Sequence, residues 1–221
     1  MIENVYTVCL IVLSYLSGSI PTSLIVGKLL RNIDIRDHGS GNAGGTNVFR
    51  VLGWRPALLV VLIDIFKGWF PCAILARYFF NVQSIPDLGV LQIFCGCSAV
   101  LGHTYTVFGG FKGGKGVSTL GGMMLALFPT VFPFCLGIAI ITIILTGYVS
   151  LASIMASCSL PILLILIPPF LGLNPAPLSI MIFSLLVPWF IIFTHRSNVQ
   201  RLRDGSENQF KNAMLFKKGK V

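Results

Sequence analysis

Long runs of apolar residues, separated by short polar stretches, dominate the pattern of this chain. Several runs approach the ~20 residues that a helix needs to cross the hydrocarbon core of a bilayer. Prolines, glycines and polar stretches interrupt the runs. The runs between them predict helices at about 5–27, 56–80, 88–108, 117–129, 131–149, 151–171 and 178–194. The pattern therefore predicts an all-α, polytopic integral membrane protein with seven transmembrane helices.

Two of the boundaries between runs, and one kink inside a run, depend on few residues. Pro129 and Pro133 divide an apolar run from Val117 to Val149 that is too long for one span without strong tilt. Pro21, near the end of the first run, predicts a kink. The turn around Tyr148 carries neither proline nor charge and rests on periodicity alone.

The composition agrees with a bilayer location. The 221 residues predict one integral-membrane domain over 1–221, and 55% of them are hydrophobic while only 10% are charged. A soluble domain carries roughly 25% charged residues. The first apolar run lacks a basic segment before it and is too long for a signal peptide, so we interpret it as a true span.

The positive charges predict the sidedness. Fourteen of the 16 Lys and Arg residues fall in the first loop, the third loop and the tail after residue 194. Lys and Arg concentrate in cytoplasmic loops, so these three segments are expected to be cytoplasmic, with an extracytoplasmic N-terminus, a cytoplasmic C-terminus and a cytoplasmic tail of about 195–221. The net charge of +9 follows from topology and lipid headgroups, and no nucleic-acid partner is expected.

The cysteines do not indicate a metal site. All six lie within apolar segments, where they serve as small buried hydrophobic residues. Cys95 and Cys97 are one residue apart, a poor spacing for zinc. We expect no metal.

Polar, glycine-rich motifs converge on the cytoplasmic face. They are Ser40–Asn47 followed by Arg50, Gly102–His103 with Phe111–Gly116, Ser150 with Ser153, and His195–Asn198 continuing through Arg201 to Glu207. Glycines let backbone amides approach an anion, and Arg and Lys bind phosphate. One such loop is explained more simply by tight turns and the positive-inside rule. Two such loops with a His/Asn/Arg cluster on one face favour a phosphorylated substrate.

The third loop is not a nucleotide-binding P-loop. Gly109 to Gly114–Lys115 has the required spacing, but Gly116 stands where the motif needs Ser or Thr. Its flanks are membrane helices, so ATP hydrolysis is not expected.

Asp64 and Lys67 lie inside the second apolar run. An isolated charge there costs roughly 2.5–3.5 kcal/mol on insertion scales. At positions i and i+3 the two side chains share a helix face and can pair. The pattern favours a structural ion pair in the bundle interior over direct catalysis.

Together these motifs resemble the PlsY family, the acyl-phosphate:glycerol-3-phosphate acyltransferases of the bacterial inner membrane. The resemblance rests on Ser40–Arg50, on Gly102–Phe108 with Phe111–Thr119, and on His195–Glu207, with Asp64–Gly68 and Tyr148–Ser150 also matching. It covers nearly the whole chain. Gly45 and Ser118 depart from it, since alanine is commoner at these positions in the family.

The resemblance implies transfer of a long-chain acyl group from acyl phosphate to the 1-hydroxyl of sn-glycerol 3-phosphate, giving lysophosphatidic acid and phosphate. It implies a multi-pass inner-membrane enzyme that is monomeric, uses no cofactor, contacts membrane lipid and has its active site on the cytoplasmic face. None of the three histidines has an Asp five positions later, so the His-x-x-x-x-Asp motif of other glycerolipid acyltransferases is absent.

The expected roles follow from the resemblance and from the need to hold two phosphates together. Catalytic roles are expected for Ser40, Arg50, Lys112, His195 and Asn198. Phosphate-binding roles are expected for Asn42, Thr46, Asn47, Gly113, Gly114, Lys115, Gly116 and Ser150, and supporting roles for Asp64, Lys67, His103 and Glu207. The family mechanism implies direct transfer, and the competing mechanism makes Ser40 or Ser150 a nucleophile with a histidine as base.

Two other classes of function remain as alternatives. A transporter or flippase for a phosphorylated solute would need a polar path through the bilayer and internal repeats. No internal repeat is seen, and the polar motifs stop at one face. A scaffold that binds anionic lipid would use Lys217, Lys218 and Lys220 of the tail but would leave the glycine loops without a role.

Overall fold

The computed structural model describes residues 2–80, 87–210 and 214, and all regular elements in them are helices. The predicted helices lie where the apolar runs place them. They are α1 (Ile2–Ser19) with α2 (Thr22–Arg31), α4 (Trp54–Phe70) continuing to α5 (Ala76–Phe80), α6 (Leu88–Thr104), α7 (Val117–Leu127), α8 (Phe132–Thr146), α9 (Val149–Phe170) and α10 (Leu178–Thr194). The all-helical fold and the division between Pro129 and Pro133 are confirmed.

Within the described residues, four stretches are long and apolar enough to cross a membrane: Val5–Arg31, Trp54–Phe80, Leu88–Gly109 and Val149–Phe170. A fifth is formed if Leu178–Thr194 and Arg196–Arg203, which bend by 66° at their junction, count as one span. α7 and α8 are apolar but have 11 and 15 residues, fewer than the ~20 of a full span. A multi-pass membrane fold is supported, while the seven spans and the orientation of the termini stay predictions.

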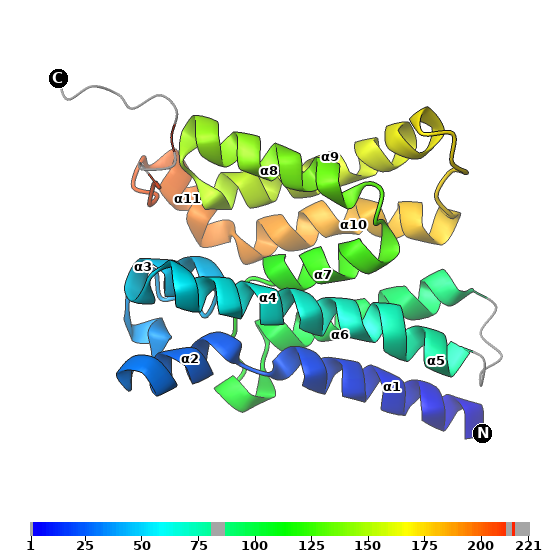
Figure 1. The fold of residues 1–221 in the computed structure, drawn as a ribbon, viewed down its shortest axis with the longest axis horizontal. Coiled ribbons are helices and arrows are strands. Elements are labelled where there is room, and N and C mark those ends of the chain that lie inside the picture. The colour runs from blue at the N-terminus through cyan, green and yellow to red at the C-terminus, as the bar shows by residue number, and fades with distance from the viewer. Residues whose placement is uncertain (1, 81–86, 211–213, 215–221) are drawn as a thin grey trace. The chain divides into compact units, whose positions relative to one another are not determined.

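The chain divides into two compact units, Met1–Phe128 and Pro129–Val221. In unit 1, α1, α4 and α6 lie side by side (Figure 1), and α7 packs on α4. The α4–α7 contact is close, since a Cβ built on Gly68 or Gly122 would lie 1.9 Å from a backbone oxygen of the other helix. Small residues allow such close approach between membrane helices.

The first predicted helix is broken at Pro21, where the kink was expected. α1 ends at Ser19, so the regular hydrogen-bonding pattern of the helix does not continue through Ser19 and Ile20, although the Thr22 amide donates to the Ile20 carbonyl at 2.9 Å. Inside a bilayer the carbonyl groups at such a break must be satisfied by protein atoms. The Thr106 hydroxyl donates to the Ser19 carbonyl, and Lys67 Nζ donates to the Ile20 carbonyl at 2.9 Å. Polar side chains from elsewhere in unit 1 therefore stabilise the break.

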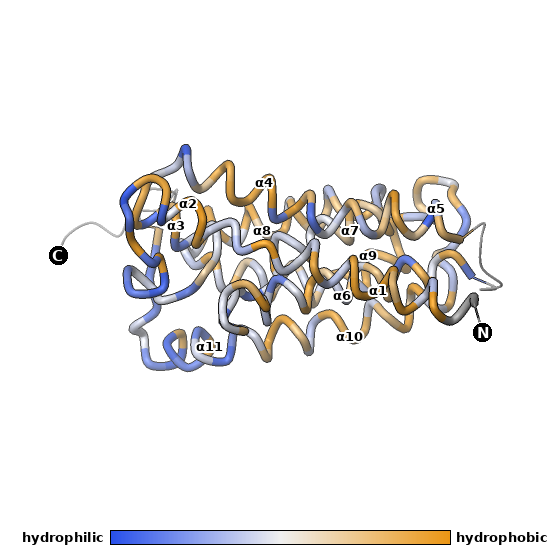
Figure 2. Tube along the Cα trace, turned by 90° about the horizontal axis from the view of Figure 1, so that it is seen from below, coloured by the Kyte–Doolittle hydropathy of each residue, from blue (hydrophilic) through white to orange (hydrophobic). Residues whose placement is uncertain are grey.

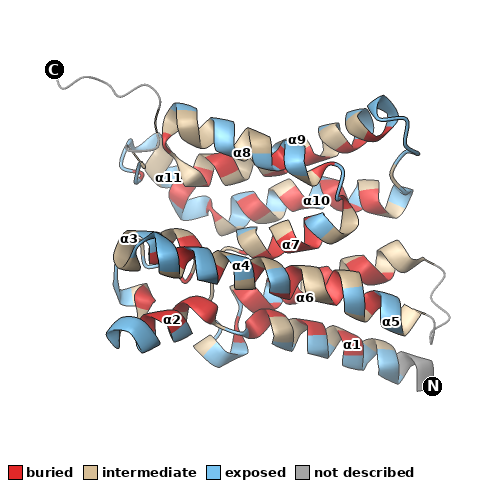
Figure 3. Ribbon diagram, in the orientation of Figure 1, coloured by how far each residue is buried: buried red, intermediate tan, exposed pale blue. Residues whose placement is uncertain are grey.

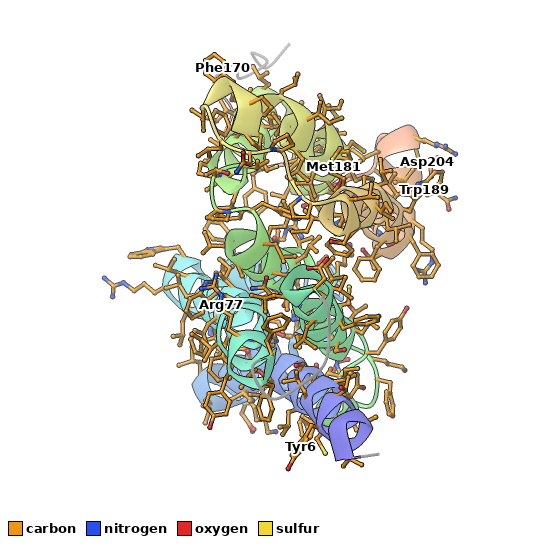
Figure 4. All side chains as sticks on the ribbon, turned by 90° about the vertical axis from the view of Figure 1, so that its right-hand side faces the viewer. Tyr6, Arg77, Phe170, Met181, Trp189 and Asp204 are labelled. Carbon is orange, nitrogen blue, oxygen red and sulfur yellow. The ribbon has the colours of Figure 1, made fainter. Side chains whose placement is uncertain are left out.

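In unit 2, α9 lies beside both α8 and α10 (Figure 1). A short helix, α11 (Arg196–Arg203), follows α10. Phe170 and Trp189 are 83% and 74% exposed, and their side chains point outward (Figure 4). Large exposed apolar side chains of this kind suit contact with lipid.

The hydrophilic residues are not spread evenly along the helices. In unit 1 they gather around α2, the short helix η1 (Ile35–Asp37) and α3 (Gly45–Leu52), and in unit 2 around α11 (Figure 2). Buried residues follow the faces along which the helices of each unit pack (Figure 3). Each unit therefore combines an apolar helical body with a polar segment.

Candidate active site

The glycine-rich first loop of unit 1 is organised by Asn47, which lies at the start of α3 and is fully buried. Its Nδ2 donates to the carbonyl groups of Ile35 and His38, both at 2.9 Å. Its Oδ1 accepts a hydrogen bond of 2.7 Å from the amide of Ser40. The Asn47 side chain therefore fixes the backbone that carries Ser40.

The other predicted residues of this region lie on the same loop and helix. Asn42 is half-buried in the loop, and Thr46 and Arg50 are half-buried in α3. Arg50 follows Thr46 by four positions, so the two side chains share a face of the helix. Unit 1 thus gathers Ser40, Asn42, Thr46 and Arg50 on one short segment.

The third loop lies against the end of α6. The amide of Gly113 donates to the Thr104 carbonyl at 3.0 Å, and that of Gly114 to the His103 carbonyl at 3.1 Å. A Cβ built on Gly113 would lie 1.9 Å from the His103 carbonyl oxygen, and one on Gly114 would lie 2.2 Å from His103 Nε2. Only glycine permits this approach. The two amides, predicted to bind phosphate, form hydrogen bonds inside the protein.

Lys112 is exposed at the tip of the loop, and Lys115 is half-buried further along it. Gly116, with φ of 80°, precedes the first turn of α7. Backbone amides at the start of a helix attract anions. The loop therefore presents a cationic tip and leads into a helix N-terminus.

A buried cluster of three ionisable side chains lies in the helices beneath these loops. Lys67 Nζ is 2.7 Å from Asp64 Oδ1, and His103 Nδ1 is 3.7 Å from the same oxygen. None of the three side chains is more than 7% exposed. The predicted ion pair in the interior of the bundle is confirmed, and it extends to His103.

The first and third loops approach each other at this cluster. A cavity of about 10 Å³, close to the volume that one water needs, is lined by Asp64, Lys67, His103, Ala43, Gly113 and Gly114 among others. The Ala43 carbonyl oxygen would lie 2.9 Å from a Cβ on Gly114. Unit 1 therefore holds both glycine-rich loops and the ion pair around one cavity.

In unit 2, the carboxylate of Glu207 collects three hydrogen bonds. Ser150 Oγ and Asn198 Nδ2 donate to its Oε1 at 3.0 and 2.7 Å, and Arg201 Nε donates to its Oε2 at 2.7 Å. Burial acts to raise the pKa of Glu207, but the hydrogen bonds from Asn198, Arg201 and Ser150 together outweigh it and hold the pKa below its ordinary value. Glu207 is therefore an ionised centre that orders two predicted site residues.

His195 follows the last residue of α10 as its C-cap and is buried. Its Nδ1 lies 2.9 Å from the carbonyl oxygen of Ile191. A carbonyl oxygen can only accept, so this contact requires a proton on Nδ1, and the neutral ring then carries its acceptor lone pair on Nε2. The main chain thus sets the tautomer of His195.

The tail after α11 reaches Ser150 because it packs on the turn between α8 and α9. The amide of Phe210 donates to the Gly147 carbonyl at 2.8 Å, and Gln209 Nε2 donates to the Thr146 carbonyl at 3.2 Å. Gln209 and Phe210 come soon after Glu207 in the chain, so their contacts hold Glu207 in place. The tail lysines at 217, 218 and 220, proposed to bind lipid, lie outside the described residues.

One pair of residues in unit 1 was not selected from the sequence. Arg36 Nη1 donates to the carbonyl groups of Gly109 and Lys112, and Asp34 holds the guanidinium group. The spacing Asp34-x-Arg36 in a loop is the only signal that could have pointed to this pair.

Comparisons with known proteins agree on a family. The family model described as glycerol-3-phosphate acyltransferase matches residues 8–205. A glycerol-3-phosphate acyltransferase of Pelodictyon phaeoclathratiforme is 42% identical, with 90% of this chain and 94% of the relative covered. One of Chlorobium chlorochromatii is 44% identical, with 90% and 95% covered.

Two crystal structures of PlsY (YgiH), an integral membrane glycerol 3-phosphate acyltransferase, have a similar fold. The glycerol 3-phosphate form has a TM-score of 0.80 and 37% identity, and covers 92% of this chain and 95% of its own. The lysophosphatidic acid form has a TM-score of 0.78 and 36% identity, with the same coverage. The chain therefore belongs to the glycerol-3-phosphate acyltransferase family of integral membrane enzymes.

Proposed function

We propose that this enzyme transfers the acyl group of a long-chain acyl phosphate to the 1-hydroxyl of sn-glycerol 3-phosphate. The products are lysophosphatidic acid and inorganic phosphate. The observation that carries the proposal is the basic, glycine-rich third loop of unit 1, which contacts the end of α6 and shares a cavity with a buried ion pair in an apolar helical body. It is supported by the similar fold of a relative solved in a glycerol 3-phosphate form.

In this proposal, cations and helix amides bind the phosphate groups. Arg50, Lys112, Lys115 and the backbone at Gly116, with the start of α7, are the phosphate-binding groups, and Asn42 and Thr46 add polar donors. Gly113 and Gly114 keep the loop against His103 by their lack of side chains. Asn47 and Ser150 act by positioning Ser40 and Glu207.

The transfer step needs no acyl-enzyme. The 1-hydroxyl oxygen attacks the carbonyl carbon of the mixed anhydride, the bond from that carbon to the phosphate oxygen breaks, and the hydroxyl proton leaves to a substrate phosphate oxygen. The catalytic roles expected from the sequence are orientation of reacting groups by Ser40 in unit 1 and by His195 and Asn198 in unit 2, since holding reactants in place supplies much of the rate enhancement. The Ser150 hydroxyl donates to Glu207, which supports a positioning role over a nucleophilic one.

The same proposal includes location and assembly. The polar segments of both units face the cytoplasm of a bacterial cell, the protein acts as a monomer in the inner membrane, and it needs no cofactor. The clustering of Lys and Arg in the first loop, third loop and tail supports this orientation.

The direct test is phosphate release from palmitoyl phosphate by the purified protein, with and without glycerol 3-phosphate. We expect release that depends on glycerol 3-phosphate, and a large loss in Lys112→Ala and Arg50→Ala with the fold retained. Near-normal rates in either variant would contradict its assigned role. Movement of glycerol 3-phosphate into liposomes without consumption of acyl phosphate would support a transporter instead.

A second measurement separates the two mechanisms. On mixing with acyl phosphate alone, direct transfer predicts no burst of enzyme-bound acyl chain. A stoichiometric burst would show a covalent intermediate and exclude the direct step.

A further inference from the structure

Arg36, on the short helix η1, reaches from the first loop of unit 1 to the third. Its Nη1 donates to the Gly109 carbonyl at 2.7 Å and to the Lys112 carbonyl at 3.1 Å. These carbonyl groups are three residues apart and mark the two ends of the loop tip. A single guanidinium nitrogen therefore closes the turn that carries Lys112.

The remaining donors of Arg36 are directed at Asp34. Nε lies 3.0 and 3.1 Å from the two carboxylate oxygens, and Nη2 donates to Oδ2 at 2.7 Å. Asp34 Oδ1 also accepts from the Arg36 backbone amide at 2.9 Å, so the carboxylate holds both the backbone and the guanidinium group of Arg36. The hydrogen bond from Arg36 is the main cause of the lowered pKa of Asp34. The planar fork of arginine suits such a bidentate contact.

The turn that Arg36 closes has an unfavourable backbone. Gly110 and Phe111 are both left-handed, with φ of 66° and 60°. Glycine adopts this conformation readily, but for a bulky residue it costs on the order of 1–3 kcal/mol and persists only where the surroundings impose it. The Phe111 side chain is 61% exposed, so packing of the ring does not explain the conformation. The hydrogen bonds of the turn, from Arg36 and from the Phe111 amide to the Thr106 carbonyl at 2.8 Å, supply the restraint.

We propose that Arg36, held by Asp34, is a positioning residue that fixes the strained turn at Gly110–Phe111 and thereby places Lys112 for phosphate binding. The relevance to catalysis rests on the proposed function, while the positioning itself does not. In this proposal Arg36 binds groups of the protein itself, because four of its five N–H donors contact the Asp34 carboxylate and the two carbonyl groups. It also couples the loop that bears Ser40 to the loop that bears Lys112.

The first experiment needs no substrate. Hydrogen exchange of the segment 105–116 is compared between wild type, Arg36→Lys and Asp34→Asn, with Arg31→Lys as a control on an exposed cation of α2. Lysine keeps the charge but cannot hold Asp34 and both carbonyl groups together. We expect exchange in this segment to speed up at least tenfold in Arg36→Lys and less in Asp34→Asn, with no change in Arg31→Lys. Unchanged exchange in Arg36→Lys would overturn the proposal.

The second experiment tests whether Arg36 acts through Lys112. Steady-state phosphate release is measured for Arg36→Lys, Lys112→Ala and the double variant. We expect Arg36→Lys to lower kcat/KM for glycerol 3-phosphate about tenfold or more in the wild-type background, but to add little in the Lys112→Ala background. Residues that act as a unit are non-additive. Full additivity would mean that Arg36 acts independently of Lys112 and would overturn the catalytic part.

The two experiments separate failure of the proposal from failure of the function. If the wild type shows no release that depends on glycerol 3-phosphate, the proposed reaction is wrong, and the exchange data alone decide the role of Arg36. If the wild type is active and Arg36→Lys has the same kcat and KM, only the catalytic role of Arg36 is wrong.

Discussion

The polar segments of the two units are built in different ways. In unit 1 the third loop contacts the end of α6 through the backbone amides of Gly113 and Gly114. In unit 2 a single carboxylate, Glu207, receives hydrogen bonds from Ser150, Asn198 and Arg201. The contact at Gly113 and Gly114 depends on the absence of side chains, and the arrangement at Glu207 depends on one negative charge.

This difference has physical consequences. A methyl group added at Gly113 or Gly114 would disturb the close contact between the loop and α6, because packed interiors have little spare volume. A carboxylate centre tolerates small changes in volume but depends on the protonation state of one group. Unit 1 is therefore expected to be sensitive to added side-chain volume, and unit 2 to the charge of Glu207. The comparison would be wrong if added volume in the loop of unit 1 had no effect, or if loss of the charge in unit 2 had none.

The largest effect is expected for Lys67→Met in unit 1. It leaves the Asp64 carboxylate buried without its close cation and removes one of the donors to the Ile20 carbonyl at the helix break. Breaking a buried pair by removing one partner costs about 3–5 kcal/mol. Thermal unfolding in detergent should show this loss.

The matched control for that variant is the double change Asp64→Asn with Lys67→Met. Removal of both charges leaves no uncompensated ion, so most of the stability should return. A single variant as stable as the double one would show that the pair is not what stabilises this region.

The next effect is expected for Glu207→Gln in unit 2. The amide keeps an acceptor for Ser150 and Asn198 but loses the charge that Arg201 contacts. Loss of a hydrogen bond to a charged group costs about 1.5–3 kcal/mol. Asp204→Asn, which removes an exposed carboxylate, is the control and should leave the free energy of unfolding nearly unchanged.

The same variant gives a pH test with a definite sign. The folded protein lowers the pKa of Glu207, so this group contributes stability above its unfolded value of 4.5 and loses that contribution as pH falls through the lower folded value. The difference in stability between wild type and Glu207→Gln should therefore be constant near neutral pH and shrink below pH 4.5. A difference that grows in acid would contradict the assignment of an ionised carboxylate.

Gly114→Ala tests the backbone contact of unit 1. The added Cβ would lie 2.2 Å from His103 Nε2 and 2.9 Å from the Ala43 carbonyl oxygen, so the loop must shift. Overpacking of this kind costs about 1–3 kcal/mol of the free energy of unfolding. We also expect a fall in the rate of phosphate release that is larger than this loss of stability accounts for, because the shift moves Lys112 and Lys115. Gly137→Ala, where a Cβ meets nothing within 4 Å, is the control. Normal activity of Gly114→Ala would show that the close approach has no role in function.

The helices were predictable from the sequence for a physical reason. A bilayer requires long apolar runs, and these located the predicted helices after the first to within a few residues, including the turn at Tyr148 that rested on periodicity alone. The sequence did not reveal α3 within the glycine-rich first loop, nor the complete break after Ser19, because the partners that satisfy the broken helix come from Lys67 and Thr106 far along the chain.

The candidate site was predictable in its residues but not in their contacts. The polar motifs and the family resemblance selected Asn47 and Glu207, but they did not show that the first holds a loop and the second accepts three hydrogen bonds. Arg36 was missed because its partners are main-chain carbonyl groups in another loop, and side-chain contacts with a distant backbone leave no periodic pattern in the sequence.

The smallest effect is expected for Ser150→Ala in unit 2. It removes one neutral donor from a carboxylate that keeps Asn198 and Arg201, so it should cost about 1 kcal/mol of stability. Phosphate release should fall by no more than about tenfold, since a shift of 1.4 kcal/mol corresponds to a factor of ten. Ser153→Ala, which removes a hydroxyl bonded to the Val149 carbonyl of the same helix, is the control. A loss of about a thousandfold or more in Ser150→Ala, with stability retained, would instead identify Ser150 as the nucleophile and contradict direct transfer.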